Sequence, residues 1–564
     1  MVDHYNVMGP VKAALEASVR YLAHELGILV WGDKGWRYLD FTYRSRFAQR
    51  TLTHAARIGS SPHHSNRWKR YSNPMNKIDT VYASRVPLYP PRVTPPPKPL
   101  NLPQSFLKFL SNPLLAIPDT VYHEPLVVLR GPPAIAWVTD PALVKIVLLD
   151  RCDDFPQDPL LRRVLGPLFG NGILTSEGRD WRWQHQTVAP LFRHGEILRY
   201  VPAMVAGAES AIKAWSAAPP GSTHAIDTDM VRATYHVISN TLLAGDGALI
   251  GETMEQGAPD YVEGLSWSMA YAALNLPVWL PRPGRRRMHF WESRLRAAVT
   301  GLIHARRASP DDRDDLFTRL LGAIDPETSQ TMSDEQLVDN LLTFVLAGHH
   351  TIAAALTWTL YLTSRAPEWE ARMLEEIRQV VPSGPVTGER IDKLVTVQQV
   401  LKESLRLFPP LPVMSRYAAE DVELAGEHIK AGTLIGLPIY VIHRHRKLWD
   451  NPDRFDPSRF APGRDVGYSR CQFMPFGVGP RICIGAAFAL IEATAMLATL
   501  VRAARFESPP GHEPIPVSRV VLLPKGGMPM RVTMRHGARL EVSRPVAHPD
   551  RTCALSPRFA LDDN

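Results

Sequence analysis

The sequence is most informative at Phe476-Gly477-Val478-Gly479-Pro480-Arg481-Ile482-Cys483-Ile484-Gly485. One cysteine lies in this loop, with glycines on both sides and an arginine two residues before it. Glycines let the backbone approach a bulky flat partner closely, so that N–H groups can point at a sulfur atom. A thiolate held in this way is a good ligand for haem iron. The other interpretation of the cysteine taken alone is a buried free thiol before a helix.

The loop matches, position by position, the haem-ligand loop of the cytochrome P450 family, Phe-x-x-Gly-x-Arg-x-Cys-x-Gly. The chain resembles that family over roughly residues 88–535. The resemblance implies a mainly α fold with a small β-rich subdomain and haem b as cofactor. It makes Cys483 the axial ligand of the haem iron and places Phe476, Gly477 and Arg481 beside the haem. The apolar residues 486–501 predict a helix directly after the loop.

A second element is a long predicted helix from Asp334 to about Ser364. Ser333 and Gln336 form a capping-box signature at its start, and Pro367 marks its end. Midway lies the segment Ala347-Gly348-His349-His350-Thr351, which resembles the oxygen-binding motif of the family, Ala/Gly-Gly-x-Asp/Glu-Thr.

This match implies that Thr351 handles oxygen and protons, while Ala347 and Gly348 make room for the haem. His350 occupies the position of the usual carboxylate. A histidine can also relay protons near neutral pH, so His350 is a candidate catalytic residue with an altered charge state. The alternative is a helix whose histidines face solvent or satisfy local hydrogen bonds.

Two further motifs are predicted to build the core and bind the haem propionates. Glu403-x-x-Arg406 places both side chains on one helical face, and Pro452-Asp453-Arg454-Phe455 follows. On their own such pairs are usually surface ion pairs. The order resembles the buried Glu-Arg-Arg network of the family, which gives Glu403, Arg406 and Arg454 a structural role. By the same resemblance the propionates are bound by four residues: Trp181, His185, Arg416 and Arg481.

The chain is predicted to have three parts: residues 1–86, 87–535 and 536–564. Residues 1–25, with Tyr5 and Lys12, resemble a fragment of an enoyl-acyl-carrier-protein reductase, but no Gly-rich dinucleotide loop precedes them. The rest of the first part is basic and has a composition typical of disorder. Residues 1–100 hold 15 Lys/Arg and 6 Asp/Glu, so the net charge of +8 comes from this leader. The last part is a polar tail, and residues 87–535 form the catalytic domain.

The cysteines and the apolar runs indicate the compartment. The four cysteines are widely spaced without a Cys-x-x-Cys pair, which predicts neither a zinc site nor a disulfide framework and fits a reducing cytoplasm. No apolar stretch reaches the ~18–20 uncharged residues of a membrane span, so we expect no transmembrane anchor. We expect no nucleic-acid partner either.

The resemblance implies a haem-thiolate monooxygenase that uses O2 to hydroxylate or otherwise oxidise a hydrophobic small molecule. About 80 residues follow Cys483, too few for a flavin domain, so electrons would come from a separate ferredoxin or flavodoxin with its NAD(P)H reductase. The replaced carboxylate at His350 keeps a peroxygenase or another non-monooxygenase haem-thiolate enzyme open as an alternative. A haem-based sensor or electron carrier is the alternative outside enzymes.

Overall fold

The computed structural model describes residues 30–32, 35–37 and 87–535, except 132, 244, 274–275, 278, 309–314, 326–327 and 465–466. The chain divides into two units, residues 1–76 and 77–564. In the first unit the described residues form an antiparallel hairpin of β1 (Val30–Gly32) and β2 (Gly35–Arg37). The predicted reductase-like fragment and the polar tail lie outside the described residues.

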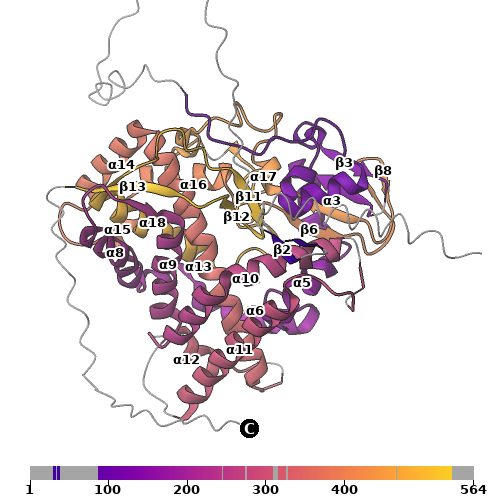
Figure 1. Cartoon of the computed structure of the whole chain (residues 1–564), viewed down its shortest axis with the longest axis horizontal. Coiled ribbons are helices and arrows are strands. Elements are labelled where there is room, and N and C mark those ends of the chain that lie inside the picture. Colours follow the sequence, from indigo (N-terminus) through magenta and orange to yellow (C-terminus); the bar gives the residue numbers. More distant parts are fainter. Residues whose placement is uncertain are drawn as a thin grey trace, which may run out of the picture. The chain divides into compact units, whose positions relative to one another are not determined.

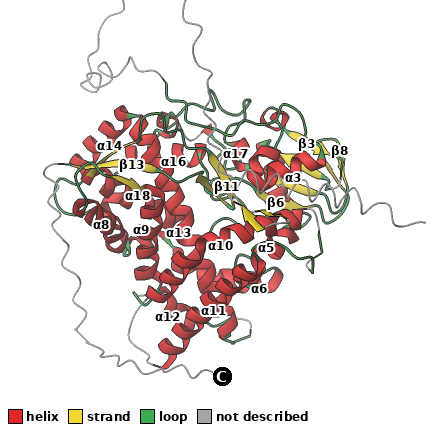
Figure 2. Ribbon diagram, viewed as in Figure 1, coloured by secondary structure: helices red, strands yellow, loops and turns green. Residues whose placement is uncertain are grey.

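The second unit is mainly helical (Figures 1 and 2). Its helices are α3 (Leu102–Ser111), α4 (Pro141–Lys145), α5 (Pro159–Phe169), α6 (Gly178–Val188), α7 (His194–Leu198), α8 (Val201–Ala217), α9 (Ile226–Leu242), α10 (Ala248–Ala273), α11 (Arg285–Ala308), α12 (Leu316–Leu321), α13 (Asp334–Arg365), α14 (Pro367–Val380), α15 (Gly388–Ile391), α16 (Val395–Leu407), α17 (Ile439–Ile442) and α18 (Ala486–Ala503).

The strands of this unit are short. They are β3 (Leu126–Leu129), β4 (Ile135–Val138), β5 (Thr223–Ala225), β6 (Met414–Tyr417), β7 (Val422–Leu424), β8 (Glu427–Ile429), β9 (Leu434–Leu437), β10 (Ala504–Glu507), β11 (Pro516–Arg519), β12 (Val521–Pro524) and β13 (Pro529–Met534). Four of them form the sheet β3-β4-β9-β6, in which only the β4–β9 pair is parallel. Gly436 of β9 pairs with Trp137 of β4, and a Cβ on this glycine would lie 2.4 Å from the indole ring.

Helix α13 crosses the helical core (Figure 1). The predicted capping box is confirmed, because the Ser333 hydroxyl accepts from Gln336 N and the Gln336 side chain accepts from Ser333 N. Its 32 residues give a rod of about 48 Å. It packs against α9, α11, α16 and α18, and most of its side chains are buried. The helix therefore passes through the core of the domain and can contribute residues to a site in the interior.

Helix α18 begins directly after the cysteine loop, as predicted. Both α13 and α18 are long and apolar enough to cross a membrane, which corrects the expectation that no stretch qualifies. In each, 72% of the apolar window is buried inside the protein. Both helices are therefore core elements of the domain, whose apolar faces contact other helices.

Candidate functional site

The cysteine loop is closed by its own backbone. The N–H of Cys483 donates to the Phe476 carbonyl at 3.0 Å, and the N–H of Ala486 donates to the Cys483 carbonyl at 3.2 Å. Gly477 and Gly479 have φ values of 72° and 85°, in the left-handed region that favours glycine. A Cβ on Gly479 would lie 2.0 Å from the Leu148 carbonyl oxygen. The glycines therefore allow a tight loop pressed against its neighbours.

The thiol of Cys483 is deep in the protein and yet accessible. Its residue is solvent-exposed, while burial by surrounding protein raises the thiol pKa and a hydrogen bond from the Gly485 backbone lowers it. These two observations agree if the sulfur faces an interior surface and not the outer one. A raised thiol pKa favours the protonated sulfur, and a metal ion bound there would favour the thiolate.

The middle of α13 shows the same combination. Ala347 is exposed and Gly348, His350 and Thr351 are half-buried, although the helix is buried on either side of this segment. The Thr351 hydroxyl donates to the Ala347 carbonyl at 2.8 Å, which anchors it to the preceding turn. This turn of α13 therefore presents a second interior surface that carries a hydroxyl and an imidazole.

The rings of the two histidines of this turn contact each other at a tilt of 36°. Their ring centres lie 4.1 Å apart, and Nδ1 of His349 lies 2.5 Å from the Val345 carbonyl oxygen. That contact requires the proton on Nδ1, so Nε2 of His349 is an acceptor, and it is buried without a partner in the part of the chain that the structure describes. Burial lowers the pKa of His350 to about 4. His350 is therefore neutral near pH 7, where a carboxylate would be charged.

Gly348 also lies against a neighbouring helix. A Cβ at this position would lie 2.7 Å from Cδ1 of Ile238 on α9. Thr234, also on α9, donates its hydroxyl to the His349 carbonyl at 3.1 Å. The missing side chain of Gly348 therefore lets α9 approach α13 at this turn.

Three cationic or protonatable groups meet beside the cysteine loop. Arg481 donates from Nη2 to the Ser176 carbonyl at 2.9 Å, and its guanidinium lies 4.1 Å from the centre of the Trp181 ring. Burial, and then the charge of Arg416, lowers the pKa of Arg481 to about 10. Burial and the charge of Arg481 also lower the pKa of His185, whose ring centre is 5.1 Å from that of Trp181. The four predicted propionate ligands are therefore brought together.

Arg416 completes this group from β6. Its Nη1 donates to the Ser415 carbonyl at 2.9 Å, and burial lowers its pKa, partly offset by Cys152 and Asp158. Gly477 lies beside the same strand, because a Cβ there would be 3.3 Å from the Met414 sulfur. Mutually repelling cations at one place are stabilised by an anion that binds between them.

These residues fit a haem group. Nη1 of Arg481 is buried without a hydrogen-bond partner among the described residues, as expected for a donor meant for a carboxylate. The arginines and His185 suit two propionates, and the accessible sulfur of Cys483 suits an iron ligand. The residues in and beside the cysteine loop therefore agree with the donor set that an iron porphyrin requires. The open turn of α13 offers a further interior surface.

The predicted structural network forms with one change of partner. Glu403 and Arg406 are fully buried and make a bidentate pair, with N–O distances of 2.7 and 2.8 Å. Arg454 was predicted as the third member, but only its backbone carbonyl takes part, accepting from Arg406 at 3.1 Å. The second guanidinium near Glu403 belongs to Arg459, at 3.6 Å. The sequence offers both arginines equally, since the Pro-x-Arg-Phe pattern recurs at Pro457-Ser458-Arg459-Phe460.

His443 connects this network to the cysteine loop and was missed by the sequence analysis. The Arg406 guanidinium donates to the His443 carbonyl at 2.7 Å. Nε2 of the His443 ring accepts from the N–H of Met474 at 3.0 Å, two residues before the loop begins. Burial, and then the charge of Arg406, lowers the pKa of His443 to about 3. A neutral imidazole therefore joins the Glu403–Arg406 pair to the base of the loop.

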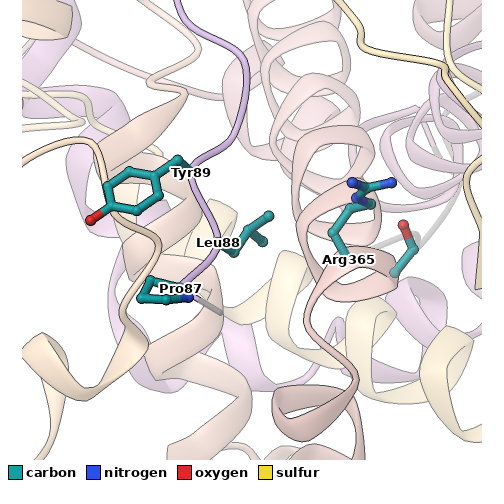
Figure 3. Close-up of a pocket in the computed structure, with 5 residues that line it drawn as sticks. Pro87, Leu88, Tyr89 and Arg365 are labelled. Atoms are coloured by element: carbon teal, nitrogen blue, oxygen red, sulfur yellow. The ribbon is translucent and has the colours of Figure 1, made fainter. Parts of the chain in front are cut away.

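A pocket of about 530 Å³ lies elsewhere, between the proline-rich entry segment and the end of α13 (Figure 3). Leu88 and Arg365 face it from opposite walls, and Pro87, Tyr89 and Ser364 complete the lining. Ser364 follows Thr351 by 13 residues, or about 20 Å along the helix. This pocket is therefore separate from the site at Cys483.

Comparisons with known proteins agree with this geometry. The family profile described as Cytochrome P450 matches residues 101–530. Cyclooctat-9-en-7-ol 5-monooxygenase of Streptomyces melanosporofaciens is 32% identical over 403 residues, covering 71% of this chain and 86% of that protein. Pentalenene oxygenase of Streptomyces avermitilis is 30% identical over 433 residues, covering 76% and 94%.

Among solved structures, the crystal structure of the cytochrome P450DA haem domain has a TM-score of 0.69 at 25% identity. The match covers 78% of this chain and 98% of that one. The resemblance of residues 1–25 to a reductase is not borne out, since the family match starts only at residue 101. The profile, the relatives and the fold agree: this chain belongs to the cytochrome P450 family.

Proposed function

We propose that this cytochrome P450 oxidises an unsaturated cyclic hydrocarbon skeleton, with Cys483 as the axial ligand of its haem b. The family assignment itself makes the chain a haem-dependent monooxygenase of hydrophobic small molecules that uses O2 and a redox partner. The proposed skeleton follows two relatives, whose names give them cyclooctat-9-en-7-ol and pentalenene as substrates. Exposed Ala347 and Leu411 offer apolar surface to such a molecule.

The observation that carries this proposal is the convergence of Arg481, Arg416 and His185 near an accessible Cys483. In their proposed roles, the two arginines and His185 bind the propionates, and the ring of Trp181 contacts the guanidinium of Arg481. Haem supplies oxygen activation when bound, and a thiolate ligand favours O–O cleavage by donating electron density. The protein's own contribution is to fix the relative positions of the Cys483 sulfur, the haem propionates and the substrate.

Proton handling falls to two residues of α13. The Thr351 hydroxyl donates to Ala347, so its oxygen lone pairs remain able to accept a hydrogen bond. The neutral ring of His350 can take a proton on one nitrogen and release one from the other. We assign Thr351 to positioning oxygen and His350 to relaying protons, with a lower proton affinity than its ordinary pKa would give.

Electrons are proposed to arrive from a separate acidic ferredoxin or flavodoxin with its reductase. Arg179, Arg182, Arg464 and Arg470 are exposed and could form part of a docking face. A complementary charge arrangement would speed association and make it sensitive to salt. The proposed compartment is the cytoplasm, since both apolar helices long enough to span a membrane are core elements.

The test is a titration of the purified full chain with cyclic alkenes and with polyols of matched size, followed by the Soret band. Turnover is then assayed with a ferredoxin, its reductase and NADPH. The proposal predicts a spectral shift with the alkenes alone and a product that carries one added oxygen atom. Absence of any response to apolar ligands contradicts it. Peroxide-driven turnover without need for reductase supports the peroxygenase alternative.

A further inference from the structure

We infer that Gln184 and Asn340 form a positioning pair that fixes α6 against α13 and so sets how tightly the haem carboxylates are bound. This inference rests on the proposed function, in which Trp181 and His185 of α6 serve the propionates. Gln184 precedes His185 directly and follows Trp181 by three residues, on adjoining faces of the same helix. A device that holds Gln184 therefore holds both ligands.

The pair belongs to a closed circuit of hydrogen bonds between two helices and a loop. Nδ2 of Asn340 donates to Oε1 of Gln184 at 3.0 Å, and Nε2 of Gln184 donates to the Asn171 carbonyl at 3.0 Å. Oδ1 of Asn340 accepts from the N–H of Ile173 at 3.0 Å. Both amide side chains are completely buried. The circuit is self-consistent only with these amide orientations, so α6, α13 and residues 171–173 share one register.

The adjacent residue of α13 fastens the same loop. Oδ2 of Asp339 accepts from the N–H of Asn171 at 2.7 Å, and Oδ1 pairs with Arg296 of α11 at 2.8 Å. Gly170 has a φ of 50°, and a Cβ there would lie 2.2 Å from Asp339 Oδ2. The loop is thus pressed onto α13 at a point that tolerates no side chain.

This loop leads directly to the residues proposed to bind the haem propionates. Its continuation reaches Ser176, whose carbonyl accepts from Arg481 at 2.9 Å. Arg481 in turn lies over Trp181 of α6. A ring of contacts therefore runs from Asn340 through Gln184 and α6 to Arg481, and back through the loop to α13. Loss of the Gln184–Asn340 bond opens this ring at its buried centre.

Stability alone does not account for two buried amides, since well-packed apolar residues would serve a core equally well. A fully satisfied polar pair contributes orientation, because only one register satisfies every donor and acceptor. Asn340 also lies seven residues, or two turns, before Ala347 on α13. The pair therefore ties the propionate side of the site to the helix that carries Thr351 and His350.

The test compares binding of haem with binding of haem dimethyl ester, which lacks the propionate charges. Release rates of both porphyrins from the full chain are measured by transfer to apomyoglobin. The variants are Gln184→Leu, Asn340→Leu and the double variant, with Gln184→Glu as a near-isosteric second choice if the leucine variants fail to fold. The control is Asn112→Ala, which removes another buried amide, bonded to Pro516 and Ser518.

In the parent, haem should leave more slowly than its ester. In Gln184→Leu and Asn340→Leu that ratio should fall at least about fivefold, because misplaced Trp181 and His185 no longer favour the carboxylates. As a single variant, His185→Ala should lower this ratio. Added to Gln184→Leu, it should lower the ratio little further. Asn112→Ala should lower thermal stability and leave the ratio unchanged.

A ratio unchanged in the Gln184 and Asn340 variants, with lowered melting temperatures like that of Asn112→Ala, overturns the inference and leaves the proposed function intact. A parent that binds both porphyrins equally, or neither, contradicts the proposed propionate site itself. The two failures are therefore distinguishable from the parent's own data.

Discussion

The guanidinium of Arg481 lies 4.1 Å from the centre of the Trp181 indole, in the interior beside the cysteine loop. A cation over an aromatic face is stabilised by about 0.5–1 kcal/mol at an exposed site and by about 2 kcal/mol or more when desolvated. The face of the indole ring contacts the guanidinium, Nη2 donates to the Ser176 carbonyl, and Nη1 has no partner among the residues that the structure describes. The arginine is thus oriented before any anion binds it.

Substitution of Trp181 by leucine should therefore weaken haem binding. We expect haem to be released about ten- to thirtyfold faster, with a smaller effect for Trp181→Phe, which keeps an aromatic face. A matched control is Trp369→Leu, which removes a similar ring under Arg372 at 4.8 Å. An equal acceleration in the control would show that the effect is general destabilisation.

The arginines of the two Pro-x-Arg-Phe segments should contribute very differently to the free energy of unfolding. Alanine at Glu403 strands the buried charge of Arg406 and should lower the free energy of unfolding by about 3–5 kcal/mol. Arg459→Ala should cost about 1–3 kcal/mol, because it removes a buried cation near Glu403. Arg454→Ala should stay within about 0.5 kcal/mol, since only its carbonyl is used. Urea unfolding of the three variants measures this, and equal costs at Arg454 and Arg459 contradict the assignment.

Arg454 and Arg459 show which part of the site could not be predicted from the sequence. Glu403-x-x-Arg406 is one helical turn, so its geometry follows from local spacing. The third residue comes from a segment about fifty positions later, where the same pattern occurs twice. Only the tertiary path of residues 450–460 decides which arginine reaches Glu403. The local elements, by contrast, were predictable: the capped α13 and the helix α18.

Two other features lay beyond the sequence for the same reason. Gly348 belongs to a motif that suggested space for a cofactor, and the structure adds a contact with Ile238 on another helix. Gln184 and Asn340 are 156 residues apart and match no motif. Such contacts arise from helix packing, which no local pattern encodes.

Gly348→Ala should accordingly lower stability through helix packing, with haem binding retained. The added Cβ meets Ile238 at 2.7 Å, and overpacking of this kind costs about 1–3 kcal/mol. The double variant with Ile238→Val should recover most of that loss in a thermal unfolding experiment. Loss of haem that Ile238→Val does not restore would favour the original expectation, in which the glycine makes room for the cofactor.

His443 should make stability depend on pH in mild acid. Its pKa is about 3 when folded and near its ordinary 6.5 when unfolded, so the unfolded chain binds more protons between these values. The contribution of His443 is therefore full above about pH 6.5 and is lost as the pH falls, by about 1.4 kcal/mol per pH unit. His443→Gln keeps a polar side chain and should flatten this slope in urea unfolding between pH 6 and about pH 4.5. A parent and variant with parallel slopes contradict the neutral buried imidazole.

The account depends most on the bond between Cys483 sulfur and haem iron, and a carbon monoxide difference spectrum of reduced protein tests it most directly. The parent should show the red-shifted Soret band of a thiolate-ligated ferrous carbonyl. Cys483→Ser should bind haem through the same propionate residues and lose that band, while Cys471→Ser, at a buried thiol on another part of the chain, should keep it. A parent-like band in Cys483→Ser, or its absence from the parent, contradicts the central claim.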